Sequence, residues 1–161
     1  MSNIWLISDL HLFHQRIIEY AERPFSDVLS MNKAIIDNWK ATVSKKDKVF
    51  VLGDIGFSAS GKLDKIIFNL PGYKVLIRGN HDKSFTDSKL MNMGFKEIYK
   101  YPIILEKKYI LSHAPLDLEL GDFKNIHGHL HQKFMDEPNY INISVENINY
   151  TPVNFEILKL L

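Results

Sequence analysis

Ile4-Trp5-Leu6-Ile7-Ser8-Asp9-Leu10-His11 is the stretch of this chain that decides its fold. Its first four residues are apolar and do not alternate with polar ones, which is typical of a strand buried on both faces of a parallel sheet. The strand ends at a carboxylate, Asp9, and an imidazole, His11, follows two residues later. Because ligands bind outside the carboxyl ends of strands in an open α/β sheet, we expect Asp9 and His11 to face a binding site.

The same pattern occurs twice more along the chain. Val49-Phe50-Val51-Leu52 ends in Gly53-Asp54, and the run from Tyr73 to Ile77 ends in Arg78-Gly79-Asn80-His81-Asp82. Apolar residues at helical spacing separate these runs. They predict helices over residues 14–22, 27–43 and 63–70. Strands joined in this way form a βαβαβ unit with right-handed crossovers, which brings the polar strand ends to one edge of the sheet.

The second half of the chain carries shorter strands, after a helix expected over residues 86–93. Strands are expected at 96–99, 102–106 and 109–112, and then at Ile141/Ile143/Val145 and Val153/Phe155/Ile157. Glu106-Lys107-Lys108 is expected to form a hairpin turn. Short, half-buried strands favour a mixed or antiparallel second sheet. Because the sequence shows no linker or internal repeat, we expect a single domain over residues 1–161.

A cluster of imidazoles, His127-Gly128-His129-Leu130-His131, follows another apolar run. Neutral imidazoles at this density are typical of a metal site, although a solvated polar loop is an alternative for the cluster taken alone. His113 also follows a predicted strand. Because five such ligand-rich segments come directly after apolar runs, we favour one shared site.

Composition narrows the class of protein. The chain has a net charge of +1 with 24% charged residues, so no strong field attracts it to nucleic acid or to an acidic membrane. Its lack of cysteine excludes thiolate catalysis and Cys-ligated zinc, and leaves His, Asp and Asn as ligands. The sequence shows neither a signal peptide nor an apolar run of about 18 residues. We therefore expect a cytoplasmic protein with no membrane partner.

Five separated motifs, in this order, resemble those of the calcineurin-like metallophosphoesterase family. They are Asp9-x-His11, Gly53-Asp54, Gly79-Asn80-His81-Asp82, His113 and Gly128-His129-x-His131. A weaker resemblance, at Arg23-Pro24-Phe25, Asn38-Trp39 and Asn149-Tyr150-Thr151-Pro152-Val153, is to small stand-alone phage or bacterial members. The family resemblance implies an α/β (α+β) fold. It would be a four-layer αββα sandwich of two mixed β-sheets, with a dinuclear metal site at the carboxyl edge of the strands.

The resemblance also implies roles for individual residues. One metal would be held by Asp9, His11, Asp54 and His131, and the other by Asp54, Asn80, His113 and His129. Asp54 would bridge two divalent ions, drawn from manganese, iron, nickel and zinc, and phosphate esters would be hydrolysed by a metal-activated hydroxide. His81 would face the phosphate with Asn80 and act as a catalytic acid or charge stabiliser. His127 has no ligand role in the family, and a hydrogen-bonding role beside the ligands is expected for it.

The substrate is less closely defined by the sequence. His14 and Arg16 lie just beyond the Asp9 loop, where they would bind a substrate phosphate, although a solvated surface accounts for them equally well. The serine/threonine phosphatase motif Gly-Asp-x-Val-Asp-Arg-Gly is absent, since this chain has Gly53-Asp54-Ile55-Gly56-Phe57. Without room for a capping domain, an open site for small phosphorylated substrates, nucleotides included, is expected. Phosphodiesters are favoured and monoesters remain an alternative.

Two other functions compete with hydrolysis of small phosphoesters. The same fold includes a non-catalytic protein-interaction scaffold, which has lost the histidine that corresponds to His81; here that histidine is present. A nuclease is the other alternative. A nuclease would need a basic groove, and the balanced charge of this chain argues against one. The sequence leaves the oligomeric state open.

Overall fold

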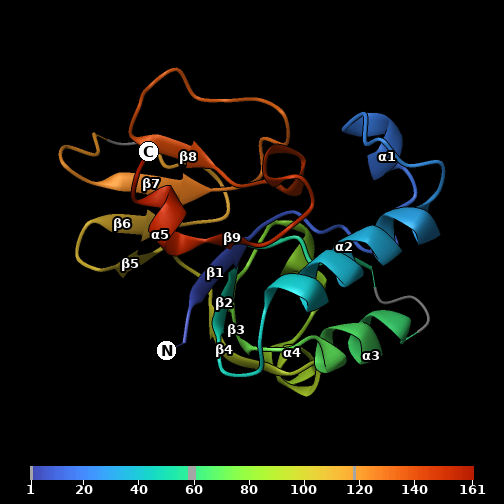
Figure 1. The fold of residues 1–161 in the computed structure, drawn as a ribbon. Helices are drawn as coiled ribbons and strands as arrows, with labels where there is room; N and C mark the ends of the chain where they lie inside the picture. Colours follow the sequence, from blue (N-terminus) through green and yellow to red (C-terminus); the bar gives the residue numbers. More distant parts are fainter. Residues whose placement is uncertain (1, 58–60, 118) are drawn as a thin grey trace.

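The computed structural model describes residues 2–57, 61–117 and 119–161 (Figure 1). Its first sheet has the strand order β4-β3-β2-β1-β9. The strands are β1 (Ile4–Ile7), β2 (Lys48–Val51), β3 (Tyr73–Ile77), β4 (Phe95–Tyr99) and β9 (Val153–Asn154). The first four run parallel, and β9 is antiparallel to β1. Their carboxyl ends therefore share one edge, as the apolar runs predict.

Helices cover one face of this sheet, as Figure 1 shows. They are α2 (Val28–Thr42), α3 (Lys62–Asn69) and α4 (Asp87–Asn92), with the short α1 (Ile17–Tyr20) beyond them. Helix α2 begins where it does because the Asp27 carboxylate accepts a hydrogen bond from the Ser30 amide at 2.8 Å. It buries Met31, Ile35 and Trp39 against the sheet. These residues belong to the larger of two apolar cores.

The second sheet packs on the other face of the first. Its strands are β5 (Ile103–Leu105), β6 (Tyr109–Leu111), β7 (Lys124–His127) and β8 (Tyr140–Asn142), in that order. Strands β5 and β6 are antiparallel and the other neighbours are parallel. Phe50 and Val75 of the first sheet meet Leu111 and Ile126 of the second in a smaller core. The expected mixed α/β fold with two mixed sheets is confirmed.

Several expected elements differ from the structure. Strand β4 was expected in the second sheet, but it pairs with β3 in the first sheet. The helix expected over 14–22 is reduced to α1, and Glu22, the last residue of the expected range, has a left-handed φ of 43° that a right-handed helix cannot include. The hairpin turn at Glu106-Lys107-Lys108 is confirmed by the β5–β6 pairing.

The alternation expected near the carboxyl terminus is confirmed only in part. Ile141, Ile143 and Val145 are buried as expected, but both strands are shorter than predicted. Val145 starts a 3₁₀ helix, η2 (Val145–Ile148), and the last strand stops at Asn154. The Asn154 side chain accepts a hydrogen bond from the Glu156 amide at 2.9 Å and so begins α5 (Phe155–Leu158). Phe155 is buried by this turn, whereas Ile157 is 57% exposed. A capping side chain thus ends the alternation of a strand.

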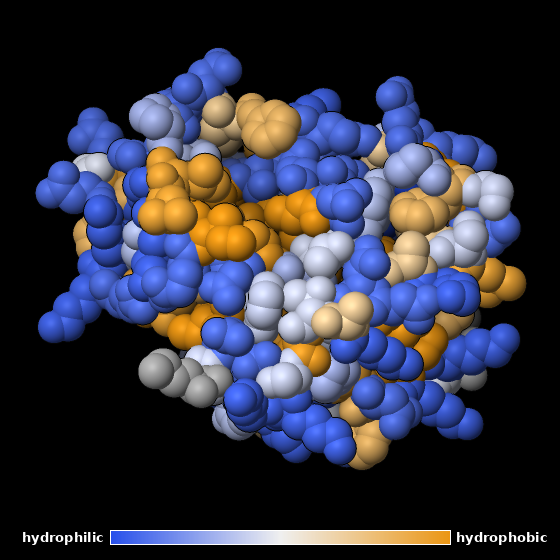
Figure 2. Space-filling view, viewed as in Figure 1, coloured by the Kyte–Doolittle hydropathy of each residue, from blue (hydrophilic) through white to orange (hydrophobic). Residues whose placement is uncertain are grey.

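The exposed surface seen in Figure 2 is mostly polar, with an apolar hollow between β8 and α5. The hollow has a volume of about 850 Å³, and its walls include Phe134, Ile141 and Ile157. None of the residues predicted for the site belongs to its described walls. In the described parts of the chain, no helix has the length and apolarity that crossing a bilayer requires.

Candidate metal centre

Loops that follow β1, β2, β6 and β7 are tied together at the carboxyl edge of the strands. The His11 amide donates to the Asp54 carbonyl at 2.9 Å, and the Gly128 amide donates to the His113 carbonyl at 2.8 Å. The His129 amide reaches across to the Asp9 carboxylate at 2.8 Å. Hydrogen bonds between the loops therefore fix the positions of the side chains that the loops carry.

Asp9, His11 and His131 form the first group of potential metal donors, with ligand atoms within 4.8 Å of one another. Asp9 Oδ2 is fully engaged, because it accepts from the His129 amide and from the Ser144 hydroxyl at 3.0 Å. Asp9 Oδ1 and His11 Nε2 are buried, have no hydrogen-bond partner among the described residues, and lie 3.9 Å apart. A buried polar atom without a partner costs about 1–3 kcal/mol. A cation between them would satisfy both atoms.

Asp54, His113 and His129 form the second group, again with ligand atoms within 4.8 Å of one another. The His113 ring donates from Nδ1 to the Leu52 carbonyl at 2.8 Å, which leaves Nε2 to act as a ligand. Asn80 Oδ1 lies 2.9 Å from that Nε2 atom. Carboxylate, imidazole and amide donors in this combination suit divalent first-row metals.

Asp54 belongs to the second group and also faces the first. Its Oδ2 atom is 3.6 Å from His11 Nε2 and 3.4 Å from His113 Nε2, while its Oδ1 atom accepts from the His81 amide at 2.9 Å. Burial opposes ionisation of this carboxyl, but the hydrogen bond and positive charge of His113 lower its pKa to about 2. The carboxylate is therefore ionised at neutral pH and faces both donor groups.

Charge also differs between the imidazoles. Burial lowers the pKa of His11 to about 2, so this ring is neutral and ready to bind a cation. Burial also opposes protonation of His113, but the Asp54 and Asp9 carboxylates raise its pKa to about 9. Without a metal, a proton on His113 thus balances the charge of the carboxylates. A divalent cation would compete for that place.

The backbone at these positions is strained. Left-handed φ angles occur at Asp9 (58°), His11 (47°), Asp54 (55°), His129 (68°) and His131 (52°). Each costs a residue other than glycine about 1–2 kcal/mol. Gly128 allows the histidine loop to approach Asp9, because a Cβ atom there would lie 2.1 Å from Asp9 Oδ2. Five of the residues predicted as metal ligands therefore carry backbone strain.

The other predicted residues lie around these two groups. His81 is exposed at the start of η1 (His81–Ser84), and its ring centroid is 5.4 Å from that of His11. His14 Nδ1 lies 3.4 Å from His11 Nδ1, whereas the Arg16 guanidinium stacks on Tyr20 at 4.9 Å. His127 is completely buried outside both groups and contacts the Gly128 carbonyl at 2.8 Å. The structure thus gathers His81 and His14 at the centre and directs Arg16 toward Tyr20.

Sequence reasoning missed a buried ion pair that supports the first group. Glu146 Oε1 lies 2.8 Å from Arg23 Nη2 and 2.9 Å from His131 Nδ1. Arg23 also donates to the backbone carbonyls of Asp9 and Leu10, at 2.8 Å and 3.1 Å. In the sequence, Arg23 stands out only as part of Arg23-Pro24-Phe25, and Glu146 comes directly after the strand expected at Ile141/Ile143/Val145. No local pattern links two residues so far apart along the chain.

Asp82 also supports the candidate metal centre, through hydrogen bonds to the loops that carry it. Its buried carboxylate accepts hydrogen bonds from the amides of Asp54, Ile55 and Gly79 at 2.8, 3.0 and 2.9 Å. Burial raises the pKa of this carboxyl. Asp82 thereby holds the loops after β2 and β3 together. In the sequence, its place in the motif Gly79-Asn80-His81-Asp82 was the one feature that could have indicated this role.

Comparisons with known proteins agree with this geometry. A family model described as calcineurin-like phosphoesterase matches residues 2–160. The uncharacterized protein MJ1445 of Methanocaldococcus jannaschii is 38% identical over 169 residues, which covers 98% of this chain and 90% of that protein. Gene 66 protein of Mycobacterium phage L5 is 40% identical over 85 residues, which is 51% of this chain and 41% of that protein.

A solved structure resembles the whole fold. It is that of a protein of unknown function, AQ665, from Aquifex aeolicus, with a TM-score of 0.76, 26% identity and coverage of 100% of both chains. The matched family uses divalent metals and acts on phosphorylated substrates, which fits the two donor groups. The chain belongs to the calcineurin-like phosphoesterase family.

Proposed function

We propose that this protein is a metal-dependent hydrolase of phosphate esters, with phosphodiesters favoured, and that it works through a dinuclear centre. The observation that carries the proposal is the position of Asp54 Oδ2, 3.6 Å from His11 Nε2 on one side and 3.4 Å from His113 Nε2 on the other. A carboxylate oxygen that lies between imidazole nitrogens of two donor sets is suited to bridging two cations. The family membership supports the same chemistry.

Each proposed ligand set consists of residues that the structure brings together. Asp9, His11 and His131 would hold one ion, and Asp54 would complete that set. The other set would contain Asp54, Asn80, His113 and His129. Two divalent ions held in this way would lower the pKa of a shared water and neutralise charge on the phosphate oxygens.

His81 would act on the phosphate without holding an ion. Its ring is exposed beside His11, and it belongs to neither donor group. Its backbone amide is fixed by Asp54 Oδ1 at 2.9 Å, so the ring is held close to the proposed bridge. From there it would donate a proton to the leaving oxygen or stabilise charge on the phosphoryl oxygens. His14 lies at the same rim, within reach of a bound phosphate.

The test starts with protein from which metal has been removed by chelation. Manganese, iron, nickel or zinc is then added singly, and turnover is measured with bis(p-nitrophenyl) phosphate and p-nitrophenyl phosphate. We expect turnover only with added metal, faster hydrolysis of the diester, and two bound ions per chain at saturation. Absence of turnover with every metal, with less than one bound ion per chain, would contradict the proposal and favour the non-catalytic scaffold.

A further inference from the structure

A pocket of about 460 Å³ opens beside the candidate metal centre. Asn80 and His113 line it and are also members of the proposed second ligand set, so the pocket and the centre share a wall. The remaining walls come from residues that follow β3, β4 and β6. This volume lies within the range of about 300–1,000 Å³ that is usual for small-molecule sites. A substrate held at the metals would place one of its substituents in this pocket.

The charge of the pocket is positive. Arg78, Lys83 and Lys100 line it, and no carboxylate belongs to its described walls. Lys83 is exposed, and no ion pair of Lys83 is found within residues 2–57, 61–117 and 119–161. Lys100 faces Asp87 at 3.6 Å, where both side chains are about half exposed or more and the attraction is screened by water. Two exposed ammonium groups are therefore available to an anion.

Arg78 has a different role in this pocket. Its Nη2 atom donates to the Phe85 carbonyl at 2.8 Å and to Asp87 at 2.5 Å. The guanidinium thus fixes the start of α4 and contributes charge without being free to turn toward a ligand. Ligand selection rests on the two lysines.

A neighbouring hollow shows the opposite charge. It shares Pro115 and Leu116 with the pocket, but its other walls include Asp117, Glu119 and Glu137. An anionic group that extends from the metal centre is therefore repelled on one side and attracted on the other. The balanced net charge of the chain conceals this local separation.

Tyr101 supplies an aromatic surface at the same pocket. It is 79% exposed, although a large aromatic side chain would normally be covered. Pro102 follows it and restricts the backbone of the loop between β4 and β5. An exposed ring on a restrained loop is suited to stacking against a nucleobase, and this contact tolerates any base.

From these observations we propose that the pocket binds one substituent of a phosphodiester and selects a nucleotide that carries a further phosphate. Tyr101 stacks on the base, and Lys83 and Lys100 bind the additional phosphate. This proposal rests on the proposed function, because it assumes that the reacting phosphate is bound at the metal centre. It adds the chemical class of the substituent that this phosphate carries. It predicts a preference for a dinucleotide with a terminal phosphate over the same dinucleotide without one.

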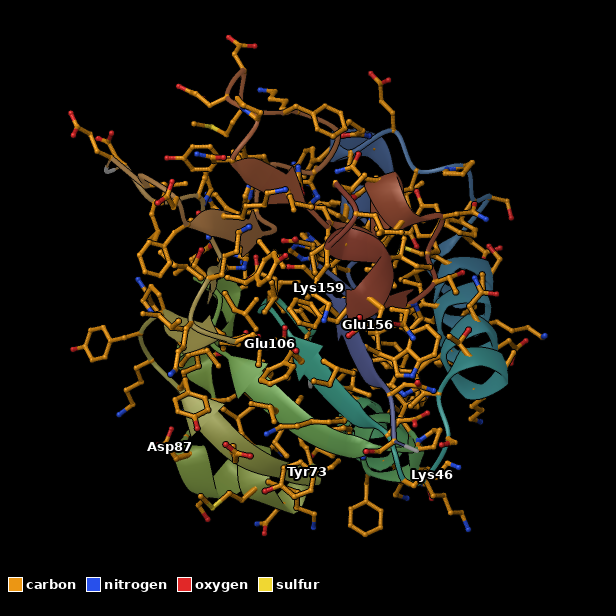
Figure 3. The ribbon with its side chains drawn as sticks, turned by 60° about the vertical axis from the view of Figure 1, so that its left-hand side comes forward. Lys46, Tyr73, Asp87, Glu106, Glu156 and Lys159 are labelled. Atoms are coloured by element: carbon orange, nitrogen blue, oxygen red, sulfur yellow. The ribbon has the colours of Figure 1, made fainter. Side chains whose placement is uncertain are left out.

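The first experiment compares thymidine dinucleotides with and without a terminal phosphate on either end, using metal-loaded protein. We expect the terminal phosphate to raise kcat/KM about tenfold at one of the two ends, as one charge-assisted contact does. In Lys83→Gln and Lys100→Gln, this advantage should fall to about twofold or less. Lys46→Gln is the matched control, because Lys46 is an exposed lysine at the amino ends of the strands (Figure 3). It should keep the full advantage.

A second experiment measures binding without catalysis. Calorimetric titration of metal-free protein, in the presence of chelator, gives the Kd of the phosphorylated dinucleotide. Tyr101→Ala should raise this Kd about tenfold, and Tyr101→Phe, which keeps the ring, should leave it within about twofold of the parent. A loss of the same size in Tyr101→Phe would contradict stacking.

The two proposals can fail separately. If bis(p-nitrophenyl) phosphate is hydrolysed but the terminal phosphate gives no advantage, the pocket inference is wrong and the proposed function stands. If no substrate is hydrolysed but the metal-free protein binds the dinucleotide in a lysine-dependent manner, the pocket inference stands and the proposed function is wrong. If neither hydrolysis nor lysine-dependent binding is observed, both are wrong.

Discussion

Buried carboxylates lie at both ends of the parallel strands, and the two ends differ in how their oxygens are used. Before β2, Asp47 accepts hydrogen bonds from the amides of Asn3 and Ser44, both at 2.8 Å, and from Trp5 Nε1 at 3.2 Å. At the carboxyl end, Asp9 Oδ1 is just as buried but has no hydrogen-bond partner among the described residues. Burial of acidic groups is therefore common to both ends. An unused ligand atom distinguishes the candidate metal centre.

Backbone conformation separates the two ends in the same way. Asn3, Ser44 and Asp47 are absent from the residues with positive φ, whereas Asp9 and Asp54 have φ angles of 58° and 55°. The amino end is thus a closed hydrogen-bonded structure whose role is stability. The carboxyl end combines strain with unsatisfied atoms, a cost that is typical of a functional site. Substitutions at the two ends should accordingly have different consequences.

The largest effect is expected for Asp54→Asn. Removal of the negative charge that faces both donor groups should weaken the binding of both proposed ions and reduce the proposed phosphodiesterase activity to the chelated background. Metal content by atomic spectroscopy and turnover of bis(p-nitrophenyl) phosphate are the measurements. Asp37→Asn, an exposed helix substitution, is the control. A variant that keeps both ions at full affinity would refute the bridging role.

His81→Ala should lower kcat by about 10²–10⁴-fold while the number of bound ions stays the same, because His81 lies outside both donor groups. The leaving group then separates two roles. If His81 donates a proton, the loss should be large for a ribose or alkyl leaving group and small for nitrophenolate. Equal losses would indicate charge stabilisation, and parental kcat/KM on both substrates would exclude a catalytic role.

A smaller effect is expected for Glu146→Gln. Because Glu146 accepts from His131 Nδ1 at 2.9 Å, its loss should weaken the affinity of the first donor group about 10–100-fold and leave the second group largely occupied. Metal titration of the folded variant is the measurement. His131→Ala should preferentially lose the same ion. Equal loss of both ions in Glu146→Gln would show that this residue acts on the fold as a whole.

The apolar runs were enough to predict β1, β2 and β3, because each is a local pattern, and their shared orientation brought Asp9, Asp54 and Asn80 to one edge. The partners of those residues were harder to foresee. Arg23 and Glu146 meet only after the two halves of the chain fold together, so no periodicity connects them. The strand predicted from alternating residues also stops early, at Asn154, because the Asn154 side chain caps the start of a helix there. Local patterns thus predicted the strands, whereas the residues that position the proposed ligands come together only through tertiary contacts.

The smallest and most local effect is expected at the amino end, in Asp47→Asn. Burial opposes ionisation of Asp47, but hydrogen bonds from Asn3, Ser44 and Trp5 lower its pKa to about 2. Its unfolded pKa is about 3.9, so its contribution to stability is complete above that pH and is lost as pH falls toward 2.

Chemical denaturation of the metal-free protein should show Asp47→Asn about 1–2 kcal/mol less stable at neutral pH, because hydrogen bonds to a charged acceptor are lost. The difference from the parent should shrink as the pH is lowered from about 4 to about 2, where the parent carboxylate itself becomes protonated. Turnover and metal content at neutral pH should match the parent, since Asp47 lies at the end of the strands opposite the donor groups. A pH-independent stability difference would show that Asp47 acts through packing rather than through its charge.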